Sequence, residues 1–212
     1  MRALRRDPRA AESFPQNPVD LQAYLSDTTA VPGVNATPGR GSHVPLYILG
    51  SSLFGAQLAA MLGLPFGFAS HFAPQSLQEA VRIYRERFVP SEQLAEPHVI
   101  AGVNVIAAES EEARMGLEQR RRSLVKVLFG RQDRALGDAE IEQVRQGPQG
   151  QHVDQMLTFT TLGHPDQVRA YLSDFRTYAD ADEILVAHQA ESVDGRLRSL
   201  DLLGAAMALA PV

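Results

Sequence analysis

The sequence predicts an α/β protein with a parallel sheet, because apolar strands and helical segments alternate along its 212 residues. The run VIAGVNVIAA at residues 99–108 is apolar almost throughout, as is typical of a strand that is covered on both faces. The segment PLYILGSSLFGAQLAAMLGLPFGFAS at residues 45–70 has the pattern of a strand, a Gly-Ser-Ser turn, a helix and a second strand. These two segments define the fold class.

The composition excludes several classes of function. Hydrophobic residues make up 44% and charged residues 21% of the chain, which indicates a packed core. The net charge of −5 argues against nucleic-acid binding, and the lack of cysteine excludes disulfides, thiolate metal sites and cysteine nucleophiles. Neither an apolar run of membrane-spanning length nor a hydrophobic signal core is found in the sequence. We therefore expect a soluble cytoplasmic protein.

The elements follow in order from an arginine-rich start. Residues 1–12 resemble the tail of a helix whose arginines face solvent or meet a phosphate, and residues 14–25 predict a short helix. Residues 26–43 are rich in Gly, Pro, Ser and Thr and indicate a loop. We expect strands at residues 44–50, 66–70, 99–108 and 183–188, and helices at residues 53–62, 76–88, 110–129, 165–178 and 194–208.

Residues 130–155 interrupt this alternation. They are polar and poor in aliphatic side chains, so they predict an insertion, either a mobile lid or a disordered loop. The charged helix before them carries Arg120, Arg121 and Arg122, for which a solvated outer face is expected. We expect one domain with about four βα units, on either an open sheet or part of a barrel. A complete barrel needs eight strands and about 250 residues.

The Gly-Ser-Ser turn is the first candidate site. Ser51 and Ser52 lie where a strand ends and a helix begins, so their hydroxyls and the helix amides could surround a phosphate. Gly50 and Gly55 would allow a close backbone approach. The alternative is an ordinary helix capped by serine, which is common. The turn alone does not decide between the two.

The second candidate site follows the next strand. Ser70 and His71 lie where parallel folds place ligand-facing residues, and histidine can bond a cofactor ring or shuttle a proton. The alternative is a loop histidine satisfied by local bonds. Asn104 interrupts an apolar strand and must find polar partners, either in a ligand or in a neighbouring strand. The histidines have no metal-ligand spacing, so we expect no metal site, and no residue is identified as catalytic.

Four segments together resemble the luciferase-like monooxygenase family, and more narrowly its bacterial flavin-dependent oxidoreductases. They are ALRRDPRAAESFP, VPLYILGSSLFGAQLAAMLGLPFGFASHFAP, YRERFVPSEQLAEPHVIAGVNVIAAES and the late GHPDQV…ADEILVAH. The resemblance implies a TIM-barrel fold with FMN at the carboxyl ends of the strands. It implies that Gly50, Ser51, Ser52 and Gly55 hold the FMN phosphate and that Ser70 and His71 lie near the ring. Reduced flavin would react with oxygen and a small organic substrate or pass a hydride onward.

The resemblance covers the family pattern only in part. Family members carry four further βα units before the segment matched here, so this chain resembles the C-terminal half of the barrel. We expect either a flavin-dependent enzyme or an inactive half-barrel that at most binds a phosphate or flavin. An open half-barrel leaves two sheet edges and an apolar inner face uncovered, so we expect a homo-oligomer. A nucleotide enzyme on an open sheet is disfavoured because a Gly-x-Gly-x-x-Gly fingerprint is lacking.

Overall fold

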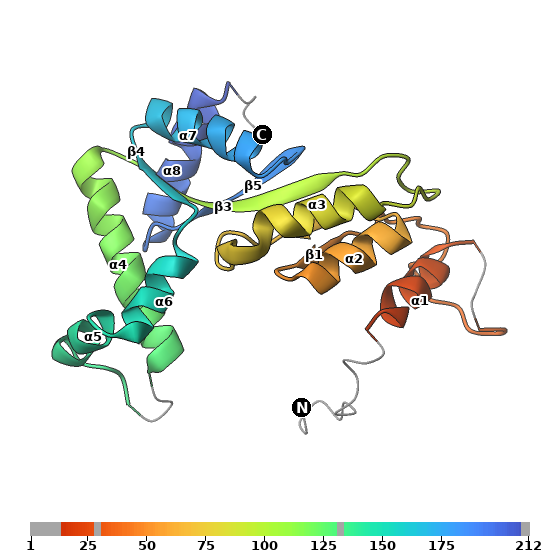
Figure 1. Cartoon of the computed structure of the whole chain (residues 1–212), viewed down its shortest axis with the longest axis horizontal. Helices are drawn as coiled ribbons and strands as arrows, with labels where there is room; N and C mark the ends of the chain where they lie inside the picture. The colour runs from red at the N-terminus through yellow and green to blue at the C-terminus, as the bar shows by residue number, and fades with distance from the viewer. Residues whose placement is uncertain (1–13, 28–30, 131–133, 209–212) are drawn as a thin grey trace.

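The computed structural model of the protein describes residues 14–27, 31–130 and 134–208. The arginine-rich segment 1–12 lies outside the described residues. Strands and helices alternate as the sequence predicts (Figure 1). The strands are β1 (Ile48–Gly50), β2 (Phe66–Phe68), β3 (Val99–Ala107), β4 (Thr160–Gly163) and β5 (Glu183–His188). The helices are α1 (Gln16–Leu25), α2 (Leu53–Leu62), α3 (Leu77–Arg87), α4 (Ser110–Phe129), α5 (Asp138–Arg145), α6 (Pro148–Met156), α7 (Pro165–Tyr178) and α8 (Val193–Ala206).

The five strands form one parallel sheet in which β3 is the central strand. β1 pairs with β2, β2 pairs with the first part of β3, and β5 pairs with β3 along most of its length. β4 pairs with the last four residues of β3, beyond the end of β2. The amide of Phe66 donates to the His98 carbonyl and the amide of Asn104 donates to the Phe159 carbonyl. Backbone groups two residues apart in a strand point to the same edge, so the His98 carbonyl and the Asn104 amide lie on one edge of β3. β2 and β4 therefore lie along this edge, and β5 pairs with the other edge.

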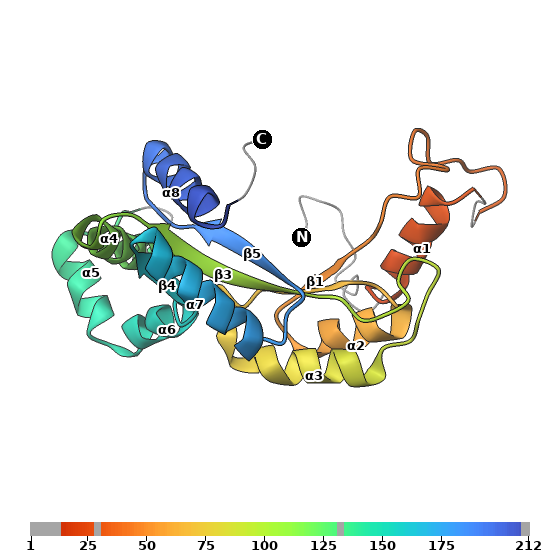
Figure 2. The same ribbon diagram turned by 90° about the horizontal axis from the view of Figure 1, so that it is seen from above.

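The core lies on the face of the sheet that carries α2, α3 and α7 (Figure 2). Alternate residues of β3 point into it, because successive side chains of a strand face opposite ways. α8 packs against α7 and the β3–β5 edge, with Leu203 in the same core. The β3 side chains in this core are those of Val99, Ala101, Val103, Val105 and Ala107.

The opposite face of the sheet is partly uncovered. The register places Leu49 of β1 beside Gly67 of β2, and Leu185 of β5 beside Gly102 of β3. The side chains of Leu49 and Leu185 are 73% and 56% exposed. This agrees with the exposed apolar inner face that we expect of an open half-barrel.

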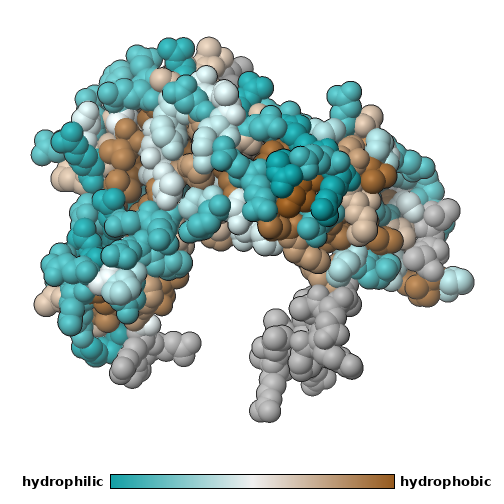
Figure 3. Space-filling view, viewed as in Figure 1, coloured by the Kyte–Doolittle hydropathy of each residue, from teal (hydrophilic) through white to brown (hydrophobic). Residues whose placement is uncertain are grey.

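The segment after β3 forms a helical arm, which we define as α4, α5 and α6. The arm has a small core of its own, and it projects from the end of the sheet at which β3 finishes (Figures 1 and 3). Of the two alternatives for the insertion at residues 130–155, a disordered loop is wrong for residues 138–156, which form α5 and α6, whereas a mobile lid stays a prediction. The few aliphatic side chains of this segment pack against α4. The buried members of this core are Leu124, Val125, Ile141, Val153 and Leu157.

Among the described residues, the helices are too short or too polar to cross a membrane.

Candidate functional site

The two turns singled out in the sequence lie side by side. Gly50 at the end of β1 pairs with Phe68 at the end of β2, and the Ala69 amide donates to the Gly50 carbonyl over 2.9 Å. Parallel strands end at the same edge of a sheet, and the residues just beyond them line the ligand sites of such folds. The structure therefore brings the Ser51–Ser52 turn and the Ser70–His71 turn to one edge. They face the arm across a broad hollow (Figures 1 and 3).

The turn after β1 is exposed. Ser52 occupies the N-cap position of α2, as the sequence predicts, but its hydroxyl makes no capping hydrogen bond. The first helical bond, from the Ala56 amide to the Ser52 carbonyl, is long at 3.5 Å. The side chains of Ser51 and Ser52 are both open to solvent. Of the two alternatives, a helix capped by the Ser52 hydroxyl is not found, and among the described residues no side chain accepts from the first-turn amides of α2.

Gly50 and Gly55 touch each other at this turn. A Cβ added to Gly55 would lie 3.5 Å from the Gly50 Cα and 3.6 Å from Cε2 of Phe66. Both distances are ordinary van der Waals contacts, so the fold itself does not require glycine at position 55. Whether these glycines and serines contact a phosphate stays a prediction.

The turn after β2 buries Ser70 and half-buries His71. Ser70 is inaccessible to solvent, and its hydroxyl donates to the Gly102 carbonyl of β3 over 2.6 Å. The ladder between β2 and β3 has already ended at Phe68 and Ala101, so this hydroxyl continues the pairing by one further bond. The structure thus assigns Ser70 a bond within the protein, and a contact of Ser70 with a cofactor stays a prediction.

His71 rests on β3 at a position that lacks a side chain. A Cβ at Gly102 would overlap Nδ1 of His71, so only glycine leaves room for this ring. Asn104 donates from Nδ2 to the His71 carbonyl over 2.6 Å and to Oγ1 of Thr160 over 3.4 Å. Phe72 meets the His71 ring edge-on at 4.9 Å between centroids. Of the two expectations for Asn104, the one that places its partners within the protein is confirmed.

The His71 ring has an unused nitrogen and an altered proton affinity. Its Nδ1 is buried without a hydrogen-bond partner among the described residues. Burial lowers the pKa of His71 below its ordinary value of 6.5, and the charge of Arg120 lowers it further. His71 is therefore neutral at neutral pH, with one ring nitrogen able to donate and the other to accept.

The sequence did not reveal Arg120 as a site residue. Arg120 belongs to α4 and is half-buried, and burial lowers the pKa of its guanidinium. The solvated outer face expected for this arginine is therefore wrong. A helical wheel could have found it, because Arg120 stands on the same face as the small residues of α4. Gly102 was missed for another reason, since the sequence does not show which ring lies over a glycine.

A second histidine at the strand ends is turned away from this edge. His188 of β5 bonds through Nδ1 to the hydroxyl of Ser199 in α8 over 2.7 Å, and burial lowers its pKa. Ser199 also accepts a hydrogen bond from the Ala107 amide.

A cavity of about 280 Å³ lies near His188, between the ends of β3 and β5, α4 and the start of α8. A larger hollow of about 740 Å³ lies near α1 and His43, away from both predicted turns.

Within the described ranges, His, Asp and Glu do not gather in a group that could hold a metal ion.

The fold and this edge together define the class of protein. The sheet is parallel and its helices cover one face. The solved structures that resemble this chain are TIM-barrel proteins, so the chain has the fold of part of a TIM barrel. The model of the luciferase-like monooxygenase family matches residues 13–181. The chain belongs to the luciferase-like monooxygenase family.

Relatives and a solved structure agree with this assignment. YvbT of Bacillus subtilis strain 168 is 37% identical over 207 residues, which are 95% of this chain and 61% of that protein. A luciferase-like monooxygenase of Escherichia coli K12 is 36% identical over 205 residues, again 95% of this chain and 61% of the relative. The crystal structure of apo-MsnO8 has a TM-score of 0.74 at 27% identity, covering 95% of this chain and 62% of MsnO8. The chain therefore spans about three-fifths of the length of these proteins.

Proposed function

We propose that this chain serves a flavin-dependent oxidoreductase or monooxygenase that uses reduced FMN with oxygen and a small organic substrate. The observation that supports it is the juxtaposition of the exposed Ser51–Ser52 turn with the half-buried His71 at one sheet edge of a luciferase-like monooxygenase. One turn offers hydroxyls and the N-terminus of a helix that has no side-chain cap, and the other offers a histidine ring at the end of β2.

The residues present fit such a cofactor. Gly50, Ser51, Ser52 and Gly55 would hold the FMN phosphate, because helix amides and hydroxyls bind oxyanions and the helix dipole favours negative charge. His71 would lie toward the ring, with its Nδ1 against Gly102 and its other ring nitrogen free to face the cofactor. When bound and reduced, FMN supplies the two electrons with which oxygen is activated for reaction with the substrate.

A titration of FMN against riboflavin tests this proposal. Riboflavin lacks the phosphate, so replacing Ser51 and Ser52 together with alanine should weaken FMN binding more than riboflavin binding. Flavin fluorescence measures both affinities, and Ser173→Ala on the exposed face of α7 is the matched control. An equal loss for both flavins would remove these serines from the phosphate role.

A second candidate is a half-barrel that does not catalyse and self-associates. The observation that favours it is the uncovered face of the sheet, on which Leu49 and Leu185 are largely exposed. Two copies could cover these faces and pair their sheet edges. We expect weak FMN binding by this chain alone and association in sedimentation at micromolar concentration. A sharp monomer peak would contradict the self-association, and nanomolar FMN binding would favour the enzyme.

A further inference from the structure

Helix α4 places a charged side chain on its buried face. Ala113, Gly116 and Leu124 are buried on this helix. Arg120 stands four residues after Gly116 and four before Leu124, which puts all three on one face. Positions of this kind in an amphipathic helix are normally apolar. Arg120 thus brings a positive charge to a position at which packing alone calls for an aliphatic side chain.

Arg120 also lacks the partner that neighbouring arginines have. Arg121 pairs with Asp154 over 2.9 Å, and Arg122 pairs with Asp138 over 2.5 Å, both within the arm. For Arg120, neither an ion pair nor a hydrogen bond is found within the described parts of the chain, and its Nε is buried without a partner. A desolvated charge normally has a counter-charge, so this guanidinium is available to an anion that the described residues do not supply.

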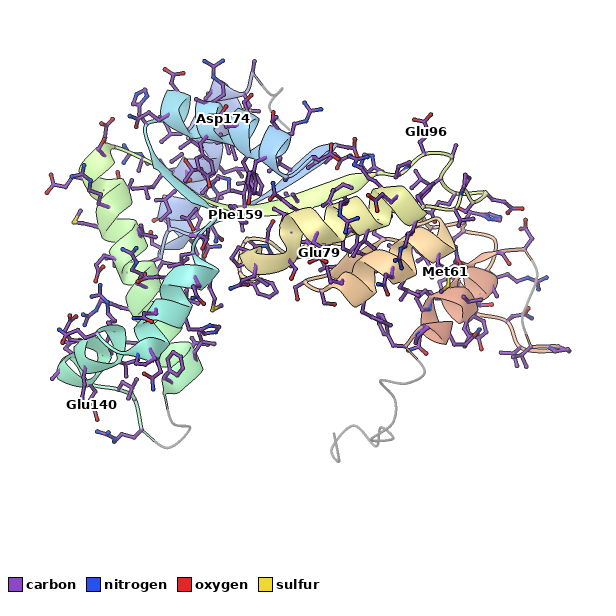
Figure 4. The ribbon with its side chains drawn as sticks, viewed as in Figure 1. Met61, Glu79, Glu96, Glu140, Phe159 and Asp174 are labelled. Atoms are coloured by element: carbon purple, nitrogen blue, oxygen red, sulfur yellow. The ribbon has the colours of Figure 1, made fainter. Side chains whose placement is uncertain are left out.

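The surroundings of Arg120 belong to the candidate site. Arg120 Nε and His71 Nδ1 are both buried without a partner among the described residues, and α4 packs against β3 and β4. The charge of Arg120 also helps to lower the pKa of His71. α4 packs against β4, where Thr160 shares Asn104 with the His71 turn. Figure 4 shows the neighbouring Phe159 where the arm meets the sheet, whereas Glu140 lies at the far end of the arm. The arm therefore contributes the positive charge and the sheet contributes the ring with an unused nitrogen.

We propose that Arg120 and His71 form a subsite at the junction of arm and sheet that binds the anionic group, a carboxylate or sulfonate, of a small organic substrate. A guanidinium presents a planar fork of donors that matches the oxygens of such a group. Nε2 of neutral His71 adds one more donor, because Nδ1 lies against Gly102. The exposed Phe72 beside His71 offers apolar surface to the remainder of the molecule. The proposal rests on the proposed function for the identity of the site, but the binding itself needs no flavin.

Binding of a simple anion tests the subsite directly. The probes are benzoate, its uncharged analogue benzamide and inorganic phosphate, and the readout is the ring resonances of His71 in NMR titrations of the whole chain. We expect benzoate to shift these resonances, benzamide to leave them in place, and Arg120→Gln to weaken benzoate at least tenfold. Arg114→Gln is the matched control, because Arg114 lies exposed on the same helix. Equal benzoate affinity in wild type and Arg120→Gln would overturn the proposal, as would the failure of benzoate to shift His71 at all.

Thermal unfolding separates this role from a structural one. Arg120→Gln should keep or raise Tm, because it removes a desolvated charge without a partner. A lower Tm that accompanies the loss of benzoate binding would identify Arg120 as structural and overturn the proposal.

FMN titrations of the same variants separate the subsite from the proposed function. If FMN fails to bind while benzoate depends on Arg120, the proposed function fails and the subsite stands. If Arg120→Gln weakens FMN binding, and inorganic phosphate competes with benzoate at this subsite, Arg120 binds the cofactor phosphate. The substrate subsite is then overturned.

Discussion

The turns after β1 and β2 occupy equivalent places in the sheet but are built in opposite ways. The first exposes two serines, one of which, Ser52, holds a cap position without making a cap. The second buries Ser70 completely and holds His71 against a bare backbone at Gly102. The difference indicates that the side chains of the first turn are not held by bonds among the described residues, whereas the second turn is fixed by contacts within the protein.

Gly102→Ala should have the largest effect on the second turn. Its Cβ would overlap Nδ1 of His71, so the ring or the strand must move, at a cost of about 1–3 kcal/mol in the free energy of unfolding. Urea unfolding measures the loss, and the His71 resonances should move with it. Gly204→Ala in α8 is the control, because a Cβ there meets no atom within 4 Å. Equal stability of the two variants would show that the His71 position is not set by Gly102.

Ser70→Ala and Ser52→Ala contrast the two turns directly. Removing the Ser70 hydroxyl leaves the buried Gly102 carbonyl without that donor, so we expect a loss of about 1–2 kcal/mol. Ser52→Ala should change the free energy of unfolding by less than about 0.5 kcal/mol, because its hydroxyl makes no capping bond to lose. Chemical denaturation of both variants tests this, and a larger effect at Ser52 would reverse the comparison.

The smallest expected effect is on the titration of His71. The pKa of His71 in the folded chain lies below the ordinary value of 6.5 that applies to the unfolded chain. Between the folded and the unfolded pKa, the unfolded chain therefore binds more protons. The stability contributed by neutral His71 is complete above pH 6.5 and falls as the pH is lowered below it. Arg120→Gln should raise the NMR midpoint of His71 but leave it below 6.5, because burial is the larger cause. His188 should not move, since burial alone lowers its pKa.

Most of the fold follows from local pattern. The apolar run that forms β3 and the helices α2, α4 and α7 could be predicted from the sequence, because each combines a clear period with recognisable ends. β4 could not, since Thr160–Gly163 is short and half-polar and pairs only because β3 extends beyond β2. Helices α5 and α6 were missed because their apolar residues are few and become a core only against α4.

The candidate site was predictable to a lesser degree. Position along the chain placed Ser51, Ser52, Ser70 and His71 at strand ends, and the structure brings them to one edge. Sequence could not separate the exposed Ser51 and Ser52 from the buried Ser70, because burial depends on the neighbouring strand. Arg120 lies about fifty residues further along the chain, and only the fold of the arm brings its charge within range of His71.

The separate core of the arm has a consequence for how this scaffold can change. The residues proposed for the cofactor belong to the sheet, while Arg120, proposed for the substrate, belongs to a segment that has a core of its own and meets the sheet at β3 and β4. Mutations in the core of the arm are thus separated from the packing around β1 and β2. Such modularity makes residues 110–156 the natural cassette to exchange or randomise when altering substrate preference, and it lets substrate range diverge while cofactor use is retained.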